Sequence, residues 1–229
     1  MLRWLFFDLG GVLLDESAFH RRMFSTIREV LTEYGHSVSE EAFSRQAYQL
    51  VESYAPTFSV SLFEAYLEKE EAERAVSIYR ARIAGKDVEL QRVFSEVPPM
   101  LEEFRHSYSL AIIANQHARI VDLLEAQDLL KYFSFRLISG EIGIAKPAPE
   151  IFTRALSLAR CTPTEAVMIG DRIDNDVIPA KAFGMFTIRL KAGTWARQVA
   201  LDPSHAPDLE IHDLKETPQA VEESRQRLA

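Results

Sequence analysis

The sequence contains a single cysteine, Cys161, among its 229 residues, so no intrachain disulfide can form. This usage fits a protein of a reducing compartment. No apolar run is long enough to span a bilayer. The hydrophobic start at residues 1–7 resembles a signal peptide, but Asp8 interrupts it, and no small-residue cleavage site precedes the first amphipathic helix. We therefore expect a cytoplasmic protein without a membrane partner.

The sequence also has fewer basic residues than acidic residues. The chain has 26 Lys and Arg against 34 Asp and Glu, which gives a net charge of -8. This balance argues against general affinity for nucleic acid, but it does not exclude a small anionic ligand, which responds to local charge. The sequence shows no internal repeat and no low-complexity tract. Its length suits one large α/β domain, or a core domain with a smaller one attached.

The spacing of apolar residues changes along the chain. Leu2–Phe7 is a nearly continuous apolar run closed by Asp8 and two glycines, which predicts a buried parallel strand followed by a loop. Over residues 16–96, apolar residues recur at helical spacing, as at Phe43, Ala47, Leu50 and Val51. Gly35 and Gly85 stand where helices would stop. This segment predicts helices and no strand.

After Pro98 and Pro99, strand-like and helix-like runs alternate. Such alternation is typical of a parallel sheet with helices on both faces. We therefore predict an α/β fold, with a Rossmann-like core at residues 1–15 and 97–229 and an inserted, all-helical segment at 16–96. The predicted later strands are 109–114, 135–138, 166–169, 186–190 and 209–211, and the predicted helices are 117–126, 149–159, 176–183 and one from 217.

Domains of this kind bind ligands at the carboxyl ends of their strands. Asp8 follows the first strand and either caps the loop or turns its carboxylate into the crevice. Asn115 closes the strand at 109–114, either as the N-cap of the next helix or as part of an anion site made by backbone amides. Lys146 is followed by Pro147, which restricts its backbone, and it is either a solvated charge or a phosphate clamp.

The stretch at residues 170–176, Gly-Asp-Arg-Ile-Asp-Asn-Asp, gathers several carboxylates at one strand end. Such carboxylates repel each other unless a cation lies between them. The alternative is that acidic residues stand at a helix N-terminus because they favour its dipole. That alternative explains Asp174 and Asp176 better than Asp171, which is still in the loop.

The order and spacing of these motifs are more specific than any one of them. An Asp after the first strand, a helical insertion, a strand ending in Asn, an isolated Lys-Pro and then Gly-Asp-x-x-x-Asn-Asp resembles the haloacid dehalogenase-like hydrolases. Residues 175–185 resemble the family's continuation of the last motif. The resemblance covers residues 1–15 and 97–215, and over 16–96 it extends only to the position and helicity of the family's cap domain.

The resemblance implies a phosphatase that depends on Mg²⁺. In this family the first Asp, here Asp8, attacks phosphorus and forms an aspartyl-phosphate, which water then cleaves. The implied phosphate contacts are Lys146 and backbone amides at Leu9, Gly10 and Asn115. The implied metal ligands are Asp8, the carbonyl of Gly10 and Asp171, with Asn175 and Asp176 supporting them from outside the coordination sphere.

Two positions depart from the family's pattern. The second Asp of the first motif, which protonates the leaving group and activates water, is replaced by Gly10. Loss of a positioned general acid typically costs roughly 10²–10⁴ in rate. The Ser or Thr that ends the second motif's strand and donates a hydrogen bond to phosphate is replaced by Ala114.

These departures leave three interpretations. The first is a phosphatase for a small phosphorylated metabolite, with a good leaving group or with acid/base function supplied by the cap or by His117. The second is a catalytically impaired module that binds phosphate or a protein partner. The third is a haloacid dehalogenase, which also uses an Asp nucleophile but is disfavoured by Lys146 beside an acidic metal site. The apolar faces of the inserted helices also allow a homodimer.

Overall fold

The computed structural model describes residues 1–229 throughout. The chain forms two compact units, Met1–Asp15 with Arg92–Ala229, and Glu16–Gln91. Residues 92–96, which the sequence analysis grouped with the helical segment, belong to the first unit. They include β3 (Arg92–Val93), which pairs antiparallel with β2 (Leu14–Asp15). No strand was predicted there, because two residues are too short to show the alternation of a strand.

The first unit is built on a six-stranded parallel sheet with the order β5-β4-β1-β6-β7-β8, which confirms the predicted α/β fold. β4 and β5 lie on one side of β1, and β6, β7 and β8 lie on the other. Such a reversal in strand order opens a crevice at the carboxyl ends of the central strands. The strands are β1 (Trp4–Phe7), β4 (Ser109–Ala114), β5 (Phe135–Ile138), β6 (Ala166–Gly170), β7 (Phe186–Leu190) and β8 (Leu209–Ile211).

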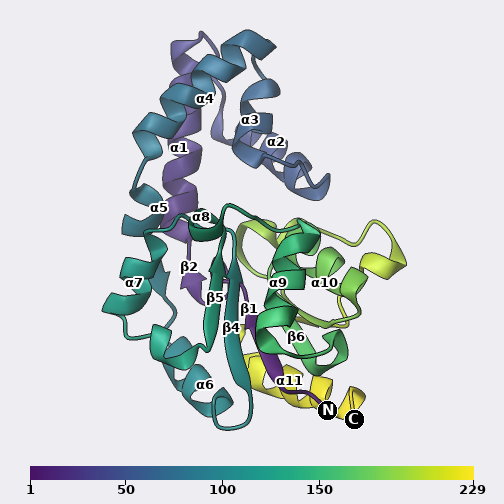
Figure 1. The fold of residues 1–229 in the computed structure, drawn as a ribbon. Coiled ribbons are helices and arrows are strands. Elements are labelled where there is room, and N and C mark those ends of the chain that lie inside the picture. The colour runs from purple at the N-terminus through teal and green to yellow at the C-terminus, as the bar shows by residue number, and fades with distance from the viewer. The chain divides into compact units, whose positions relative to one another are not determined.

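Helices cover both faces of this sheet (Figure 1). Phe6 of β1 packs in a buried cluster with Ile151 and Phe152 of α9 (Pro149–Ala159). The next side chain, Phe7, points to the opposite face, where its ring stacks on Phe104 of α6 (Val97–Phe104) with the centroids 6.3 Å apart. Because both faces are covered, β1 must be apolar at successive positions, which explains the continuous hydrophobic run at the start of the chain.

Two predicted helices of this unit differ at their starts from the structure. The helix predicted at 117–126 begins at Ile120, and the helix predicted at 176–183 is one turn of π-helix (Ile173–Val177) followed by α10. The remaining helices are α7 (Ile120–Ala126), α8 (Ser139–Ile142), α10 (Ile178–Phe183) and α11 (Thr217–Arg227).

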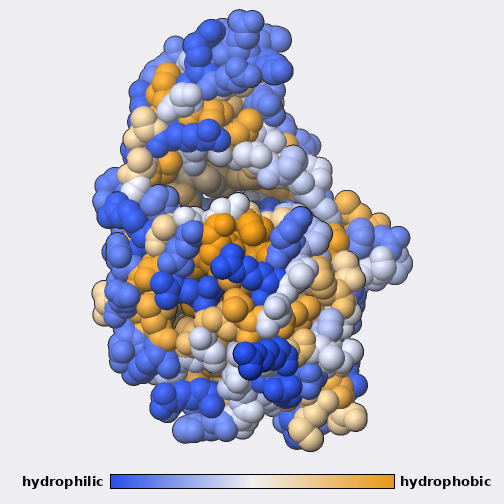
Figure 2. All heavy atoms as spheres, viewed as in Figure 1, coloured by the Kyte–Doolittle hydropathy of each residue, from blue (hydrophilic) through white to orange (hydrophobic).

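The second unit consists of the helices α1 (Ser17–Glu33), α2 (Glu40–Glu52), α3 (Phe58–Glu64), α4 (Lys69–Ile83) and α5 (Lys86–Glu89). Aromatic rings join them: Phe24 of α1 lies 5.7 Å from Phe43 of α2 and 6.1 Å from Phe58 of α3, between centroids. Figure 2 shows mainly hydrophilic residues over the top of this unit and patches of hydrophobic residues below them. None of the helices is both long and apolar enough to cross a membrane.

Candidate active site

Asp8 begins the loop that follows the central strand β1. All four residues of β1 are buried, and the Asp8 amide continues the ladder by donating to the Ile169 carbonyl of β6 at 2.9 Å. Asp8 therefore lies at the carboxyl edge of the sheet, where it is only 8% exposed. A carboxylate with so little contact with water needs a charged partner.

Asn115 follows β4, the neighbour of β1, and its side chain fixes the backbone of Lys146. Nδ2 of Asn115 donates to the Lys146 carbonyl at 2.7 Å, and the Lys146 amide donates to Oδ1 of Asn115 at 2.7 Å. A side-chain amide carries the same donor and acceptor as a peptide group, so this pair restrains Lys146 as a neighbouring strand would. Phosphate binding by the Asn115 backbone remains a prediction, and this anchoring role was not predicted, because no local pattern links residues so far apart.

The ammonium group of Lys146 lies between two carboxylates. Its Nζ is 2.9 Å from Oδ1 of Asp8 and 2.5 Å from Oδ1 of Asp176, and the residue is 3% exposed. Burial by itself would lower the pKa of this amine, but the charges of Asp176 and Asp8 outweigh burial and raise the pKa above its usual value. Lys146 therefore remains charged and supplies a fixed positive charge at the site.

Asp171 and Asp176 come from the turn that follows β6. With Asp8 they form a buried group in which one carboxylate oxygen from each lies within 4.8 Å of the others. Asp176 is held at both oxygens, since Oδ1 accepts from Lys146 and Oδ2 accepts from the Arg172 amide at 3.0 Å. Burial raises the pKa of Asp176 to about 6. The nearby Asp8 carboxylate also raises this pKa, and together the two effects exceed the lowering by Lys146.

Two glycines make room for these carboxylates. A Cβ at Gly11 would lie 2.4 Å from Oδ2 of Asp171, and a Cβ at Gly170 would lie 2.3 Å from Cγ of Asp176. Gly11 also has a φ of +70°, a conformation that other residues rarely adopt. The close approach of these two glycines to the carboxylates was not predicted from the sequence.

The group fits a divalent cation by its chemistry. Lys146 contacts two of its three carboxylates, and one ammonium cannot offset the negative charge of all three. All three offer oxygen ligands, which Mg²⁺ prefers, and carboxylates so close together are stabilised by a cation between them. Asp8 and Asp171 are the residues that would hold the ion, with Asp176 fixed beside them.

The loop after Asp8 is a tight turn without a proton-transferring side chain. The Leu9 carbonyl accepts hydrogen bonds from the amides of Leu13 and Leu14, both at 2.8 Å, and Gly10 bridges to Leu14. The metal and phosphate contacts assigned to Gly10 and Leu9 remain predictions. Six glycines have positive φ and Gly10 is not among them, so a side chain at this position meets no such backbone restriction.

Two further positions bear on the predicted site. Asn175 lies in the π-helical turn Ile173–Val177, directly before Asp176. Its role in supporting the metal ligands remains a prediction. Ala114 ends β4 fully buried, directly before Asn115, so the end of this strand offers a methyl group and no hydroxyl.

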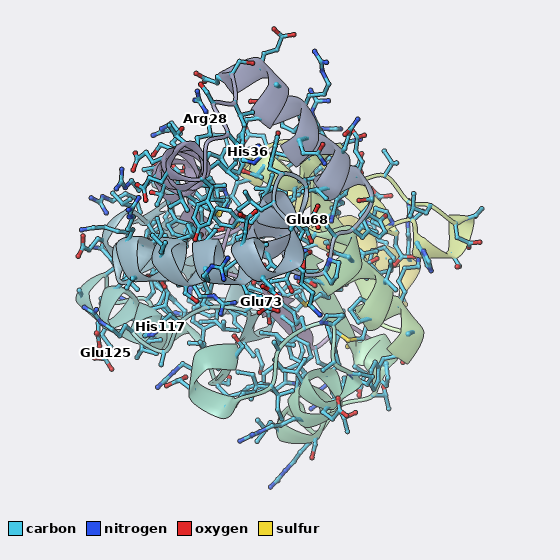
Figure 3. The ribbon with its side chains drawn as sticks, turned by 90° about the horizontal axis from the view of Figure 1, so that it is seen from above. Arg28, His36, Glu68, Glu73, His117 and Glu125 are labelled. Atoms are coloured by element: carbon cyan, nitrogen blue, oxygen red, sulfur yellow. The ribbon has the colours of Figure 1, made fainter.

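His117, one of the predicted alternatives for proton transfer, lies in the loop before α7. Its Nδ1 accepts a hydrogen bond from the Arg119 amide at 3.2 Å, and Figure 3 shows it at the periphery of the view, near Glu125 of α7. A role of His117 in proton transfer remains a prediction.

Comparison with known proteins agrees with this geometry. Residues 2–184 match the family model of the haloacid dehalogenase-like hydrolases. The chain belongs to this family. The resemblance inferred from the motifs is thus confirmed.

Similar proteins narrow the class of reaction. The phosphoserine phosphatase of Thermus thermophilus is 31% identical over 194 residues, which cover 80% of this chain and 74% of that protein. A glyceraldehyde 3-phosphate phosphatase of Methanopyrus kandleri is 26% identical over 230 residues, covering 97% and 98%. Family and relatives identify this haloacid dehalogenase-like hydrolase as an enzyme of the phosphatase group.

Solved structures share the fold over nearly the whole chain. A haloacid dehalogenase-like hydrolase from Streptococcus pneumoniae has a TM-score of 0.72 at 22% identity and covers 96% of this chain and 98% of its own. A 2-haloacid dehalogenase from Pseudomonas syringae has a TM-score of 0.61 at 26% identity and covers 100% of both chains. The chain is thus similar both to a protein named as a dehalogenase and to relatives named as phosphatases.

Proposed function

We propose that this protein is a magnesium-dependent phosphatase that hydrolyses a small phosphorylated metabolite through an aspartyl-phosphate at Asp8. The observation that carries the proposal is the buried contact of Asp8 with Lys146 beside Asp171 and Asp176, at the end of the central strand. The relatives named above act on phosphoserine and glyceraldehyde 3-phosphate, which supports a small phosphate ester as substrate.

The proposed reaction has two displacements at phosphorus. A carboxylate oxygen of Asp8 forms a bond to phosphorus while the bond from phosphorus to the ester oxygen breaks. Water then attacks phosphorus, the bond to Asp8 breaks, and inorganic phosphate leaves. Lys146, paired with Asp8 at 2.9 Å, neutralises part of the charge on the phosphoryl oxygens in both steps. Mg²⁺ held by Asp8, Asp171 and the Gly10 carbonyl would supply further positive charge there.

The missing side chain at Gly10 determines which esters react. An alkoxide is a poor leaving group and needs a proton as its bond to phosphorus breaks, whereas a phenolate or carboxylate leaves without one. We therefore expect aryl and acyl phosphates to be hydrolysed with Mg²⁺ present and alkyl phosphates to react far more slowly. Steady-state rates over a panel of phosphate esters, with 2-haloacids included to detect halide release, test this proposal. We expect no halide release.

Gly10→Asp should accelerate alkyl phosphates most, by roughly 10²-fold, because it restores a group that can protonate the leaving oxygen. Gly10→Asn is the matched control, since it has the same shape and cannot deliver that proton. The kcat/KM for aryl esters divided by that for alkyl esters should decrease in Gly10→Asp and stay unchanged in Gly10→Asn. Equal cleavage of both ester classes by the wild type would show that another residue supplies the proton. Binding of vanadate without any hydrolysis would instead favour the non-catalytic module.

Mg²⁺ should raise the melting temperature of the wild type by roughly 5–10 °C when it is present at about 100 times its Kd. The reason is that the ion offsets repulsion among Asp8, Asp171 and Asp176 in the folded state only. Asp171→Asn should lose most of this shift. Asp122→Asn, on the exposed surface of α7, changes the net charge equally and should keep it. An equal shift in all three proteins would place the metal elsewhere.

A further inference from the structure

Two buried polar side chains outside the proposed chemistry hold the acidic turn from its outer side. Arg189 of β7 is 1% exposed and Gln198, in the segment after β7, is fully buried. Burying groups of this kind is unfavourable unless their hydrogen bonds are made. Arg189 has one hydrogen-bond partner in the turn that carries Asp171 and Asp176, and Gln198 has two.

Arg189 connects the turn to the segment at residues 193–198. It stands beside Gly170 in the ladder of β6 and β7, and its Nε donates to the Asp171 carbonyl at 3.2 Å. Its Nη1 donates to the Gln198 carbonyl and its Nη2 to the Trp195 carbonyl, both at 2.9 Å. The planar guanidinium therefore fixes three backbone carbonyls relative to one another.

Gln198 holds the middle of the turn with its side-chain amide. Its Oε1 accepts from the Ile173 amide at 2.7 Å, and its Nε2 donates to Oδ1 of Asp174 at 2.8 Å. Asp174 also accepts from Nε of Arg172 at 3.0 Å, and the Arg172 guanidinium lies 3.9 Å from the centre of the Trp195 ring. These contacts hold the turn without using the carboxylates of Asp171 and Asp176.

We propose that Gln198, supported by Arg189, is a positioning residue that sets the distance between the Asp171 and Asp176 carboxylates for the metal. The inference rests on the proposed function. Asp171 precedes a single turn of π-helix, Ile173–Val177, and Asp176 lies within it; the first amide of that turn, at Ile173, donates to Gln198. Since π-helical turns are rare and irregular, contacts from outside determine their geometry. Groups that orient metal ligands commonly change metal affinity by about 10–100-fold.

Gln198→Met tests the inference, because methionine has a similar length and makes neither hydrogen bond. Thr187→Val is the matched control. Thr187 is fully buried on the same strand, two residues before Arg189, and its hydroxyl donates to Oδ2 of Asp208 at 2.8 Å, in a network without contact to residues 171–176. We expect both variants to melt at lower temperature without metal. Only Gln198→Met should weaken Mg²⁺ binding, by about 10-fold or more in calorimetric titrations without substrate.

The Mg²⁺ dependence of the hydrolysis rate tests the same variants in a second way. In Gln198→Met, the Mg²⁺ concentration for half-maximal hydrolysis should rise by the same factor as the dissociation constant, while kcat at saturating Mg²⁺ should fall less. A merely structural role would lower the amount of folded enzyme and leave the Mg²⁺ requirement unchanged. If Gln198→Met does not fold, Gln198→Asn, which is one methylene shorter, is titrated in its place with the same expectation.

The outcomes separate this inference from the proposed function. Mg²⁺ binding as tight in the Gln198 variant as in Thr187→Val would overturn the positioning role, while wild-type hydrolysis and Mg²⁺ binding would stand. A wild type that neither binds Mg²⁺ nor hydrolyses any phosphate ester would overturn the proposed function and this inference with it.

Discussion

Asp8→Asn is expected to abolish the hydrolysis of aryl and alkyl phosphates alike, with kcat reduced by at least roughly 10⁴-fold. An amide has the shape of the carboxylate but is not a nucleophile, so the covalent path is closed for every substrate. The variant should still fold, because Lys146 keeps its contact with the second carboxylate, Asp176. Steady-state rates with Mg²⁺ on one aryl and one alkyl ester measure the effect.

Retained binding of inorganic phosphate by Asp8→Asn would show that the loss is chemical and not a collapse of the site. Asp122→Asn, exposed on α7, serves again as the control for a change in net charge and should keep the wild-type rate. A rate of Asp8→Asn within about tenfold of the wild type would mean that water attacks the substrate directly. The proposal of an aspartyl-phosphate intermediate would then be wrong.

Most of the fold and the meeting of the motifs could be predicted from the sequence, for a simple physical reason. The strands of a parallel sheet covered on both faces are apolar at successive positions, so Leu5–Phe7 and Leu110–Ala114 can be recognised without neighbours. The carboxyl ends of parallel strands share one edge, so residues that follow neighbouring strands lie close together. Asp8 and Asp171, after the neighbouring strands β1 and β6, are brought together in this way.

What could not be predicted are contacts that depend on packing between distant segments. The hydrogen bonds between Asn115 and Lys146 span 31 residues, and those between Gln198 and Ile173 span 25, with no periodicity to indicate either. The close approach of Asp171 to Gly11 depends on the path of two loops. Side chains that position others leave no pattern in a single sequence, whereas Asp8, Asn115 and Asp171 directly follow strands and can be found.

Lys146 is the group on which both the stability and the chemistry of the site should depend most. Lys146→Met removes the only cation within contact of Asp8 and Asp176 and leaves two buried carboxylates without a charged partner. Removing one partner of a buried ion pair is expected to lower the unfolding free energy by about 3–5 kcal/mol, measured by urea denaturation without Mg²⁺. The rate should also fall, by roughly 10²–10³-fold, because a fixed charge on the phosphoryl oxygens is lost.

The loss of unfolding free energy in Lys146→Met should depend on pH. Burial already raises the pKa of Asp176 to about 6, and loss of the neighbouring ammonium should raise that pKa further. A carboxyl whose pKa is higher in the folded state than in the unfolded state favours folding at low pH and loses that contribution as the pH rises through the folded-state pKa. The deficit of Lys146→Met should therefore be smaller near pH 5 than near pH 8, and Mg²⁺ should reduce it by neutralising the carboxylates. Lys191→Met is the control, because its pair with Glu210 is about one-third exposed and should contribute about 1 kcal/mol or less at either pH. Equal and pH-independent losses in the two variants would show that Lys146 only fills space between the strand ends, and its assignment as a phosphate clamp would then fall.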